Sequence, residues 1–490
     1  MTALKPSESD RRDPAIEPQR PTLTYRPGLD GLRAFAVLAV MGYHADISWL
    51  AGGFLGVDVF FVLSGFLITS LLVVELEKSG RVNLLAFWGR RARRLLPAIV
   101  VVLIAVAIYA NWIAEALALP GIRSDSFATM GFVNNWRYAT GGGSYFENFD
   151  IFTSPLRHTW SLAIEEQFYF VWPIVLLLGW KLTRRTGDPR RAMFFVAVIG
   201  ALASAALMFA LYLPEHDRAR VYFGTDTRAQ AVLIGAALAL YAAWRKLPSF
   251  STARSRAVLT ISCVVLAAMI VGVGDTSSML FYGGFLVAAA VAMVATAGAA
   301  QPGRFADALS VDPLVAIGRL SYGLYLWHWP VFVAMRETNL RGLSLLVAEF
   351  AITFACALAS FVLIEQPIRT RRFKGASAGH RIGFAFGGVA LAIALGTALF
   401  AATANPIRTD RPLSSAAPIT VQRPLRIAFG GDSTTFTLSY FGDISNRAKV
   451  DSLAWAELGC GFLLAERING IVPDPECKEW PARWSTFVDE

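Results

Sequence analysis

The sequence predicts an all-α polytopic membrane protein with about eleven transmembrane helices, followed by a smaller and less apolar segment. The 490 residues are 55% hydrophobic and only 17% charged, and the mean hydropathy is +0.49, so a soluble enzyme is excluded. Eleven apolar runs are long enough to cross a bilayer. They are 29–48, 54–74, 95–114, 158–180, 192–213, 226–244, 257–273, 280–300, 314–335, 343–364 and 382–401.

The distribution of basic residues orients these spans. With a cytoplasmic N-terminus, the inner segments hold 26 Lys and Arg and the outer loops hold 7. Because cytoplasmic loops are enriched in basic residues, this asymmetry predicts that the C-terminal segment is extracytoplasmic. The net charge of +9 therefore reflects membrane orientation, and we expect no nucleic-acid partner.

The chain divides into five parts. Residues 1–28 are polar and Pro-rich, lack an apolar signal-peptide region, and are expected to form a disordered cytoplasmic tail. Residues 29–375 form the membrane domain, and 382–401 form an eleventh helix. A linker rich in Pro, Ser and Thr follows at 402–424. In the last part, 425–490, the stretch LRIAFGGDS is typical of a strand entering a turn.

The first span carries Asp30, Arg33 and His44. Arg33 and His44 share a helix face about 16 Å apart, and Asp30 can pair with Arg33. Ionisable groups in lipid usually face the protein interior, although anchoring at the membrane interface explains Asp30 and Arg33 about as well as function does. Anchoring explains His44 poorly, and a histidine can serve as a general base toward a hydroxyl. Arg33 could attract an anionic donor or pair with Asp30.

A basic cluster, GRRARRLLP, adjoins the third span. Arg91 and Arg94 are i, i+3 neighbours and can hold one phosphorylated ligand from the same face. Arg90 and Arg93 lie beside them. The alternative is anchoring by positive charge on the inner side, which physical reasoning alone favours.

The fourth span begins with RHTWSLAIEEQFYFVWP. One helix face carries His158, Ser161, Glu165, Tyr169 and Trp172. Glu165 is a site candidate because a carboxylate at this depth should face the bundle, whereas Glu166 points elsewhere. The aromatic residues could instead form a belt at the membrane interface.

The ninth span, GRLSYGLYLWHWPVF, places Ser321, Tyr325 and His328 on one face. A buried core histidine and a functional histidine are equally good readings of His328. On the predicted outer side, Asp226 and Arg228 are expected to form an interface ion pair.

Three further features lie on the predicted outer side. The Gly- and Asn-rich loop 115–157 has the length of a lid or binding loop. The GGDS motif ends in Ser433, whose hydroxyl could face backbone N–H donors, although a plain turn is the default reading. Cys460 and Cys477 are the only cysteines expected on this oxidising side, so they should form a disulfide.

Taken together, these motifs resemble acyltransferase family 3, the membrane O-acyltransferases that include O-antigen acetylases. The similarity covers about 25–375. It rests on RPGLDGLRAFAVLAVMGYH, GGFLGVDVFFVLSGFLIT, RRARRLLP, TWSLAIEEQFYFVWP, IGRLSYGLYLWHWP and EQPIR. The family's arginine-x10-histidine motif falls on Arg33 and His44, and its arginine-x-x-arginine motif falls on Arg91 and Arg94. The resemblance implies transfer of acyl groups from cytoplasmic acyl-CoA to envelope glycans outside.

One branch of that family resembles ten such helices plus an eleventh that leads to an extracytoplasmic SGNH hydrolase-like domain, and this chain has the same layout. Ser433 matches the SGNH nucleophile block. The later Asp-x-x-His block is missing, because the last histidine is His380. We therefore expect 425–490 to be the start of an incomplete α/β domain without esterase activity, and any missing block to lie beyond Glu490.

The resemblance predicts an integral O-acyltransferase of the bacterial cytoplasmic membrane, with acetyl-CoA as the expected donor and no metal. A cell-envelope glycan or lipid-linked sugar would be the acceptor, in contact with membrane lipids. His44 would act as base or transient acyl carrier, and Arg33 would hold the thioester end or tune His44. Glu165 would position the acceptor or the histidine. Phosphates would be held by Arg91, Arg94 and Arg90, and further candidates are Asp30, Ser161, Tyr169, His328 and Ser433.

Two other functions fit parts of the pattern. A transporter that passes acyl groups or another solute would share the intramembrane charges, and only acyl product formed by this chain separates the two. A structural or sensor protein with a degenerate site is disfavoured, because Arg, His and Glu cluster on helix faces.

Overall fold

The computed structural model describes most of the membrane domain and two strands of the C-terminal part. The described residues are 25–114, 118–140, 154–214, 218–245, 247, 249–370, 426–431 and 451–456. The chain separates into two compact units, Met1–Arg408 and Thr409–Glu490. Each unit is described by itself below.

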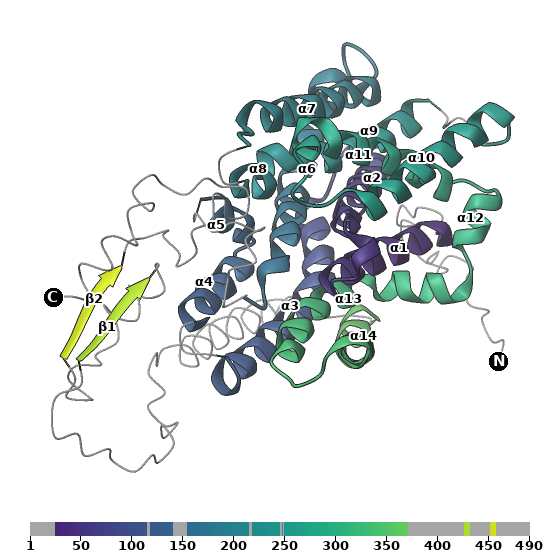
Figure 1. Cartoon of the computed structure of the whole chain (residues 1–490). Helices are drawn as coiled ribbons and strands as arrows, with labels where there is room; N and C mark the ends of the chain where they lie inside the picture. The colour runs from purple at the N-terminus through teal and green to yellow at the C-terminus, as the bar shows by residue number, and fades with distance from the viewer. Residues whose placement is uncertain are drawn as a thin grey trace, which may run out of the picture. The chain divides into compact units, whose positions relative to one another are not determined.

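The described part of the first unit is helical (Figure 1). Its long helices are α1 (Pro27–His44), α2 (Gly56–Ser79), α3 (Leu84–Trp112), α6 (Trp160–Thr183), α7 (Pro189–Leu211), α9 (Thr225–Trp244), α10 (Ala253–Gly272), α11 (Phe285–Ala299), α13 (Asp312–Arg336) and α14 (Gly342–Ser360). Shorter helices are α4 (Leu119–Met130), α5 (Asn134–Thr140), α8 (Ala219–Phe223), α12 (Arg304–Leu309) and α15 (Gln366–Thr370). Single turns of other helix types are η2 (Ser48–Leu50), η3 (Gly53–Leu55), η5 (Arg157–Thr159), η6 (Leu280–Gly284) and η7 (Phe361–Glu365).

Each of the first ten predicted spans coincides with one long helix of the described residues, which confirms the all-α character of this unit. The eleventh predicted span, 382–401, lies outside the described residues. The largest difference is at α3, which begins at Leu84 instead of residue 95. Asn83 explains the early start, because its side chain accepts a hydrogen bond from the Ala86 N–H and caps the helix.

The predicted loop 115–157 is wrong as a single loop, because it contains helices α4 and α5. Asn134 and Asn135 at the start of α5 are fully buried. Asn134 Nδ2 donates to Thr159 Oγ1 at 2.7 Å, and Asn135 Nδ2 donates to Thr225 Oγ1 at 2.8 Å. These amides bind the segment to the N-terminal ends of α6 and α9. The asparagines of this stretch therefore form a buried hydrogen-bond network and do not indicate an open loop.

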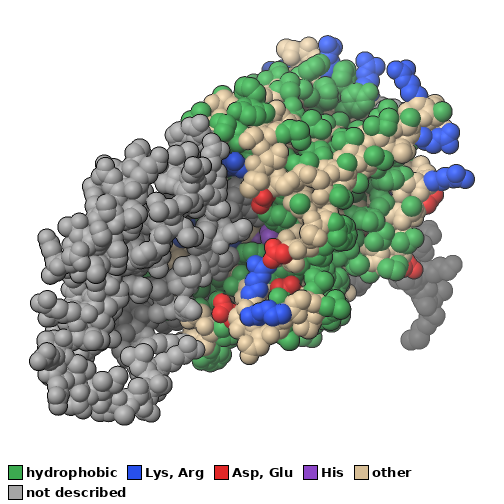
Figure 2. Space-filling model, viewed as in Figure 1, with side chains coloured by type: hydrophobic (Ala, Val, Ile, Leu, Met, Phe, Trp, Pro, Cys, Tyr) green, Lys and Arg blue, Asp and Glu red, His purple; other side chains and the backbone are tan. Residues whose placement is uncertain are grey.

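The surface of the first unit is apolar over long helices. Within the described residues, seven helical segments are long and apolar enough to cross a membrane. They are Gly53–Ser79, Leu84–Trp112, Arg157–Thr183, Pro189–Leu211, Ala253–Gly272, Leu280–Ala299 and Gly342–Ile368. Hydrophobic side chains cover much of the visible face in Figure 2, with Lys and Arg gathered mainly along one edge. Such helices are stable in lipid, so the chain is a multi-pass membrane protein.

Helix α2 lies in the interior and packs against α1, α6, α9 and α11. Its closest crossing is with α9, where Gly65 and Gly235 oppose each other. A Cβ atom added at Gly65 would overlap the Val232 carbonyl oxygen, and one added at Gly235 would overlap the Val62 carbonyl oxygen. Small residues allow this backbone approach, which is a common source of packing energy between helices in lipid.

The second unit contains strands β1 (Arg426–Gly431) and β2 (Asp451–Ala456). They pair in parallel, with Arg426 opposite Asp451 and Gly431 opposite Ala456. The predicted strand in LRIAFGGDS is therefore confirmed as β1. Ser433, Cys460 and Cys477 lie outside the described residues, so the predicted nucleophile turn and disulfide remain predictions.

Candidate functional site

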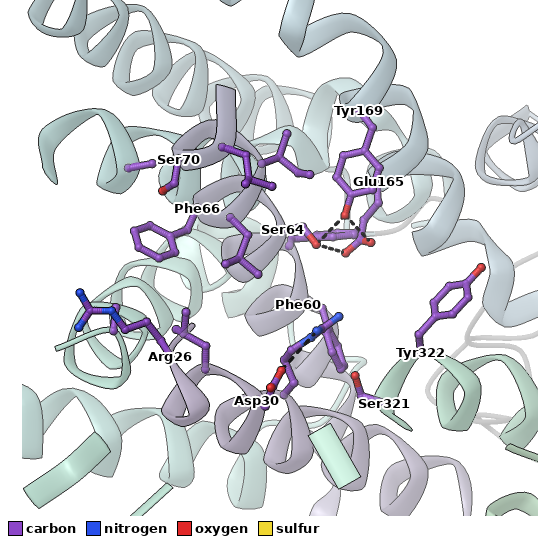
Figure 3. Close-up of a pocket in the computed structure, with 18 of the residues that line it drawn as sticks. Arg26, Asp30, Phe60, Ser64, Phe66, Ser70, Glu165, Tyr169, Ser321 and Tyr322 are labelled. Carbon is purple, nitrogen blue, oxygen red and sulfur yellow. Dashed lines mark hydrogen bonds and ion pairs between the residues drawn. The ribbon is translucent and has the colours of Figure 1, made fainter. Parts of the chain in front are cut away.

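A cavity of about 810 Å³ lies inside the helical bundle (Figure 3). Helix α2 lines it from Val57 to Glu77, a run of about 30 Å at the helical rise of about 1.5 Å per residue. Other walls come from α1, α3, α6, α9 and α13. The volume is within the range of about 300–1,000 Å³ that ligand pockets occupy, and the shape suits a long, narrow ligand.

The N-terminal half of α1 brings an ion pair to this cavity. Arg33 Nη1 lies 3.7 Å from Asp30 Oδ1, and both residues line the cavity. Tyr25 donates its hydroxyl to Asp30 Oδ2 at 2.7 Å. The predicted i, i+3 pair is therefore confirmed, and Arg33 faces an interior space, which anchoring alone does not require.

Helix α3 adds two more guanidinium groups. Arg91 and Arg94 both line the cavity, as their i, i+3 spacing predicted. The Arg91 guanidinium lies 5.7 Å from the centre of the Phe87 ring and 5.6 Å from that of Tyr169. The positive charges of Arg33, Arg91 and Arg94 repel one another. Like charges gathered in a buried space make it receptive to an anion.

Arg90 is separate from this cationic group. Its Nη2 lies 3.6 Å from Glu75 Oε2, and its side chain is 49% exposed. It is not among the described residues that line the cavity. Arg93 is exposed as well, so the structure divides the basic cluster into two cavity arginines and two surface arginines.

Glu165 belongs to a three-residue hydrogen-bonded group in the cavity wall (Figure 3). Ser64 Oγ donates to Glu165 Oε1 at 2.9 Å. The Tyr169 hydroxyl lies 2.9 Å from Ser64 Oγ and 3.3 Å from Glu165 Oε2. The shared face of Glu165 and Tyr169 was predicted from helical spacing, but Ser64 was not. A polar serine within the apolar run VFFVLSGFLI was the available signal for it.

Tyr325 and Ser161 line the far end of the cavity. Their hydroxyl oxygens lie 2.6 Å apart, and the Tyr325 hydroxyl also donates to the His158 carbonyl oxygen at 2.9 Å. The Tyr325 ring centre lies 5.5 Å from that of His158 and 5.3 Å from that of His328. Tyr325 therefore lines the cavity and also contacts two residues of a histidine cluster.

The histidine cluster consists of His44, His158 and His328. His44 Nδ1 lies 3.0 Å from His328 Nε2, and His328 Nδ1 lies 2.7 Å from the Tyr325 carbonyl oxygen. His158 Nε2 lies 3.2 Å from the Leu326 carbonyl oxygen. None of the three is among the described residues that line the cavity. Helix α1 thus carries Arg33 into the cavity and His44 into a different environment.

Pro330 explains how His158 can bond to a helix backbone. Proline has no N–H, so residue 330 cannot donate to the carbonyl group four residues earlier, that of Leu326. His158 donates to that carbonyl oxygen from another segment. The HWP sequence therefore creates the acceptor that holds His158 against α13.

Pro173 does the same within α6. It cannot donate to the Tyr169 carbonyl group, and Trp88 Nε1 donates to that oxygen at 3.1 Å. This bond joins α3 to α6 beside the cavity arginines. Pro173 and Pro330 therefore each link two helices by leaving one carbonyl oxygen for a side chain.

Arg336 fixes the end of α1. Its Nη2 donates to the His44 carbonyl oxygen at 2.6 Å and to Asp46 Oδ2 at 2.8 Å. A guanidinium at the C-terminal end of a helix also complements the helix dipole. The position of His44 therefore depends on α13 through both its side chain and its backbone.

The predicted ion pair between Asp226 and Arg228 is wrong. Residues two apart on a helix do not face each other, and the two side chains find different partners. Arg220 Nη2 lies 2.6 Å from Asp226 Oδ2, whereas Arg228 Nη2 lies 3.0 Å from Asp58 Oδ2 on α2. Arg228 is only 1% exposed, and its guanidinium lies 3.9 Å from the centre of the Phe285 ring.

Among the described residues, no group of three His, Cys, Asp or Glu side chains could hold a metal ion. Within that same part of the chain, the carbonyl partners of His158 and His328 already engage one nitrogen of each ring. The arrangement can bind an elongated anion in the cavity and transfer a proton at the histidines.

Comparison with known proteins gives consistent matches. The family model described as an acyltransferase domain matches residues 26–365. The chain is 40% identical over 357 residues to the peptidoglycan O-acetyltransferase OatA of Listeria monocytogenes, covering 71% of this chain and 56% of that protein. It is 39% identical over 360 residues to the O-acetyltransferase OatA of Staphylococcus aureus, covering 71% and 58%.

A third relative is the putative peptidoglycan O-acetyltransferase YrhL of Bacillus subtilis, 38% identical over 364 residues that cover 72% of this chain and 56% of that protein. The chain therefore spans between 56% and 58% of the length of these curated relatives. No solved structure matches the chain.

Proposed function

This chain belongs to the acyltransferase family whose domain model covers residues 26–365, and on that premise we propose that it transfers an acyl group, with acetyl expected, from cytoplasmic acyl-CoA to a hydroxyl of a cell-envelope glycan. The observation that carries the proposal is the elongated cavity that has four arginines among its lining residues, Arg26, Arg33, Arg91 and Arg94. Acyl-CoA combines phosphate groups with a long pantetheine arm, so it matches both properties.

We assign the phosphates to Arg91 and Arg94, and the thioester end to the neighbourhood of Arg33. Guanidinium groups form strong hydrogen bonds with phosphate oxygens, and binding an anion relieves the mutual repulsion of these arginines. Arg90 is left out of this assignment because it pairs with Glu75. Asp30 keeps Arg33 in place through their ion pair.

The proposed acceptor is a sugar hydroxyl outside the cytoplasm, on a glycan or a lipid-linked sugar. Two of the relatives named above are peptidoglycan O-acetyltransferases by their names. The charge distribution along the chain, with a cytoplasmic N-terminus, would place the unit Thr409–Glu490 on the same outer side. Ser433 would then face the acceptor side and be a second candidate acyl acceptor.

In the proposed reaction His44 takes the proton of the acceptor hydroxyl as its oxygen bonds to the acyl carbon. The carbon–sulfur bond breaks, and the leaving thiolate receives that proton from the imidazolium. Glu165, held by Ser64 and Tyr169, positions the acyl end in the cavity wall. Ser161 and Tyr325 line the same cavity, and the Tyr325 ring contacts His158 and His328, so we place the route of the acyl end to His44 beside them.

The test uses the full chain in lipid nanodiscs with radiolabelled acetyl-CoA and peptidoglycan fragments. We expect label on the glycan and one free CoA thiol for each acetyl group transferred, and neither product from His44→Ala. Label that stays on CoA under all conditions would overturn the proposal.

One competing function is a transporter of acyl groups or another solute, which a cavity about 30 Å long would also serve. Proteoliposomes with acetyl-CoA outside or inside distinguish the two. A transporter moves its solute across the bilayer without forming acylated glycan, whereas the transferase releases one CoA thiol for each glycan hydroxyl that it acylates.

A further inference from the structure

We propose that His328 is a positioning residue that fixes the tautomer of His44, so that Nε2 of His44 is the basic atom. The inference rests on the proposed function, in which His44 is the base. It follows from two hydrogen bonds in series, from His44 Nδ1 to His328 Nε2 at 3.0 Å and from His328 Nδ1 to the Tyr325 carbonyl oxygen at 2.7 Å.

The hydrogen bond between His328 and the Tyr325 backbone determines the tautomer of His328. A carbonyl oxygen can only accept, so His328 Nδ1 carries the hydrogen and donates it. A neutral imidazole has one donor and one acceptor nitrogen. Nε2 of His328 is therefore the acceptor.

The second bond then has one possible direction. His44 Nδ1 must carry the hydrogen that it donates to His328 Nε2, which leaves the lone pair of His44 on Nε2. The orientation of both rings is thus set by one backbone carbonyl group on α13.

The surroundings of His328 and His44 favour the neutral imidazole rings on which these bond directions depend. His328 is fully buried, and its ring packs against those of Phe332 and Tyr325. Burial among apolar groups disfavours a charged imidazole. The Arg336 guanidinium, bonded to the His44 carbonyl oxygen, further disfavours a positive charge at the resting His44.

His158 provides an internal comparison. It bonds the Leu326 carbonyl oxygen through Nε2, so its hydrogen lies on Nε2 and its lone pair on Nδ1. The three histidines of the cluster should therefore show two tautomers, with the hydrogen on Nδ1 in His44 and His328 and on Nε2 in His158.

A fixed tautomer has a chemical consequence for the base. The lone pair of His44 then lies on Nε2, and the charge that forms on the ring when Nε2 takes a proton is stabilised through the Nδ1–H donated to His328. Without His328, the two tautomers of His44 would interchange and the ring could rotate, so only part of the population would be competent.

The first experiment reads the tautomers directly. The full chain is labelled with ¹⁵N-histidine, placed in lipid bilayers and measured by solid-state NMR, in which protonated and unprotonated ring nitrogens are well separated. The chain has only five histidines, so single substitutions assign the signals. We expect His44 to carry its hydrogen on Nδ1, and a hydrogen on Nε2 of His44 would overturn the inference.

The second experiment compares two variants at His328. Glutamine places an amide oxygen near the position of Nε2 and can accept from His44, whereas phenylalanine keeps the ring but offers no acceptor. We expect His328→Phe to lower kcat about 100-fold, at the low end of the 10²–10⁴-fold contribution of general-base catalysis, with the KM for acetyl-CoA unchanged. His328→Gln should retain kcat within about tenfold of wild type and keep the Nδ1–H signal of His44.

The outcomes separate this inference from the proposed function. Equal kcat in His328→Phe and wild type would overturn the positioning role. The expected tautomers in a wild-type protein that forms no acyl product would overturn the proposed function and still support the tautomer assignment. If His328→Phe does not fold, the inference is tested by the tautomer signals of the wild-type protein and by the kcat and Nδ1–H signal of His328→Gln.

Discussion

Helices α1 and α13 contribute residues to both the cavity and the histidine cluster, but the two regions have opposite chemical character. The cavity gathers guanidinium groups that repel one another and lack enough carboxylates to neutralise them. The histidine cluster is held by neutral hydrogen bonds to the backbone of α13. The comparison teaches that one helix can present an arginine, Arg33, to a charged cavity and a histidine, His44, to a separate cluster of histidines.

The largest expected effect tests whether the two regions have separate roles. His44→Ala should lower acyl transfer by about 10²–10⁴-fold, because it removes the general base. The Kd for acetyl-CoA should stay within about twofold, because His44 is not among the described residues lining the cavity. Product formation and isothermal titration with the same protein batch measure both, and a parallel loss of binding would show that the regions are one site.

The next effect concerns a buried ion pair that serves neither region. Asp58→Asn should lower the free energy of unfolding by about 3–5 kcal/mol, because it leaves the Arg228 guanidinium buried without its charged partner. The matched control is Arg220→Gln, which breaks the more exposed pair with Asp226 and should cost no more than about 1 kcal/mol. Thermal unfolding in detergent compares them, and equal losses would contradict the distinction.

A smaller effect is expected within the basic cluster. Arg91→Ala and Arg94→Ala should each weaken acetyl-CoA binding by about 1.5–3 kcal/mol, since each removes a hydrogen bond to a charged group. Arg90→Ala is the control, because it has the same charge change on the same helix but pairs with Glu75. Binding is titrated at fixed salt. Equal losses of acetyl-CoA affinity in all three variants would indicate that the arginines act only through general positive charge at the membrane surface.

The smallest effect tests the boundary between the regions. Tyr325→Phe removes the hydroxyl that bonds Ser161 and the His158 carbonyl oxygen but keeps the ring. We expect kcat to fall about fivefold, which corresponds to about 1 kcal/mol for a neutral hydrogen bond, with CoA affinity unchanged. Stopped-flow measurement of thiol release reports kcat. A rise in acetyl-CoA hydrolysis without a glycan acceptor would also show that this hydroxyl keeps the cavity apart from the histidine cluster.

Helical periodicity predicted much of this arrangement. The spans, the pairing of Asp30 with Arg33, and the common face of Arg91 and Arg94 all depend on contacts within one helix. Such contacts follow from the helix repeat alone. Periodicity also located Glu165 in the bundle interior.

Contacts between helices could not be predicted in the same way. The bond between His44 and His328 joins residues 284 positions apart, and that between Arg228 and Asp58 joins residues 170 apart. The sequence shows that such groups must find buried partners but does not say which ones, because helix packing decides that. The early start of α3 was missed for a different reason, since its arginines lowered the local hydropathy that marked the span.

Two helix prolines leave the carbonyl groups of Leu326 and Tyr169 without an intrahelical donor, and this has a consequence for membrane insertion. An unsatisfied carbonyl in hydrocarbon costs several kcal/mol, so each helix gains a strong preference for one neighbour. In both cases the donor, His158 or Trp88, comes earlier in the chain than the carbonyl it satisfies. Because synthesis proceeds from the N-terminus, each donor is already in the membrane when its acceptor helix arrives. The order of the sequence thereby directs the order of assembly.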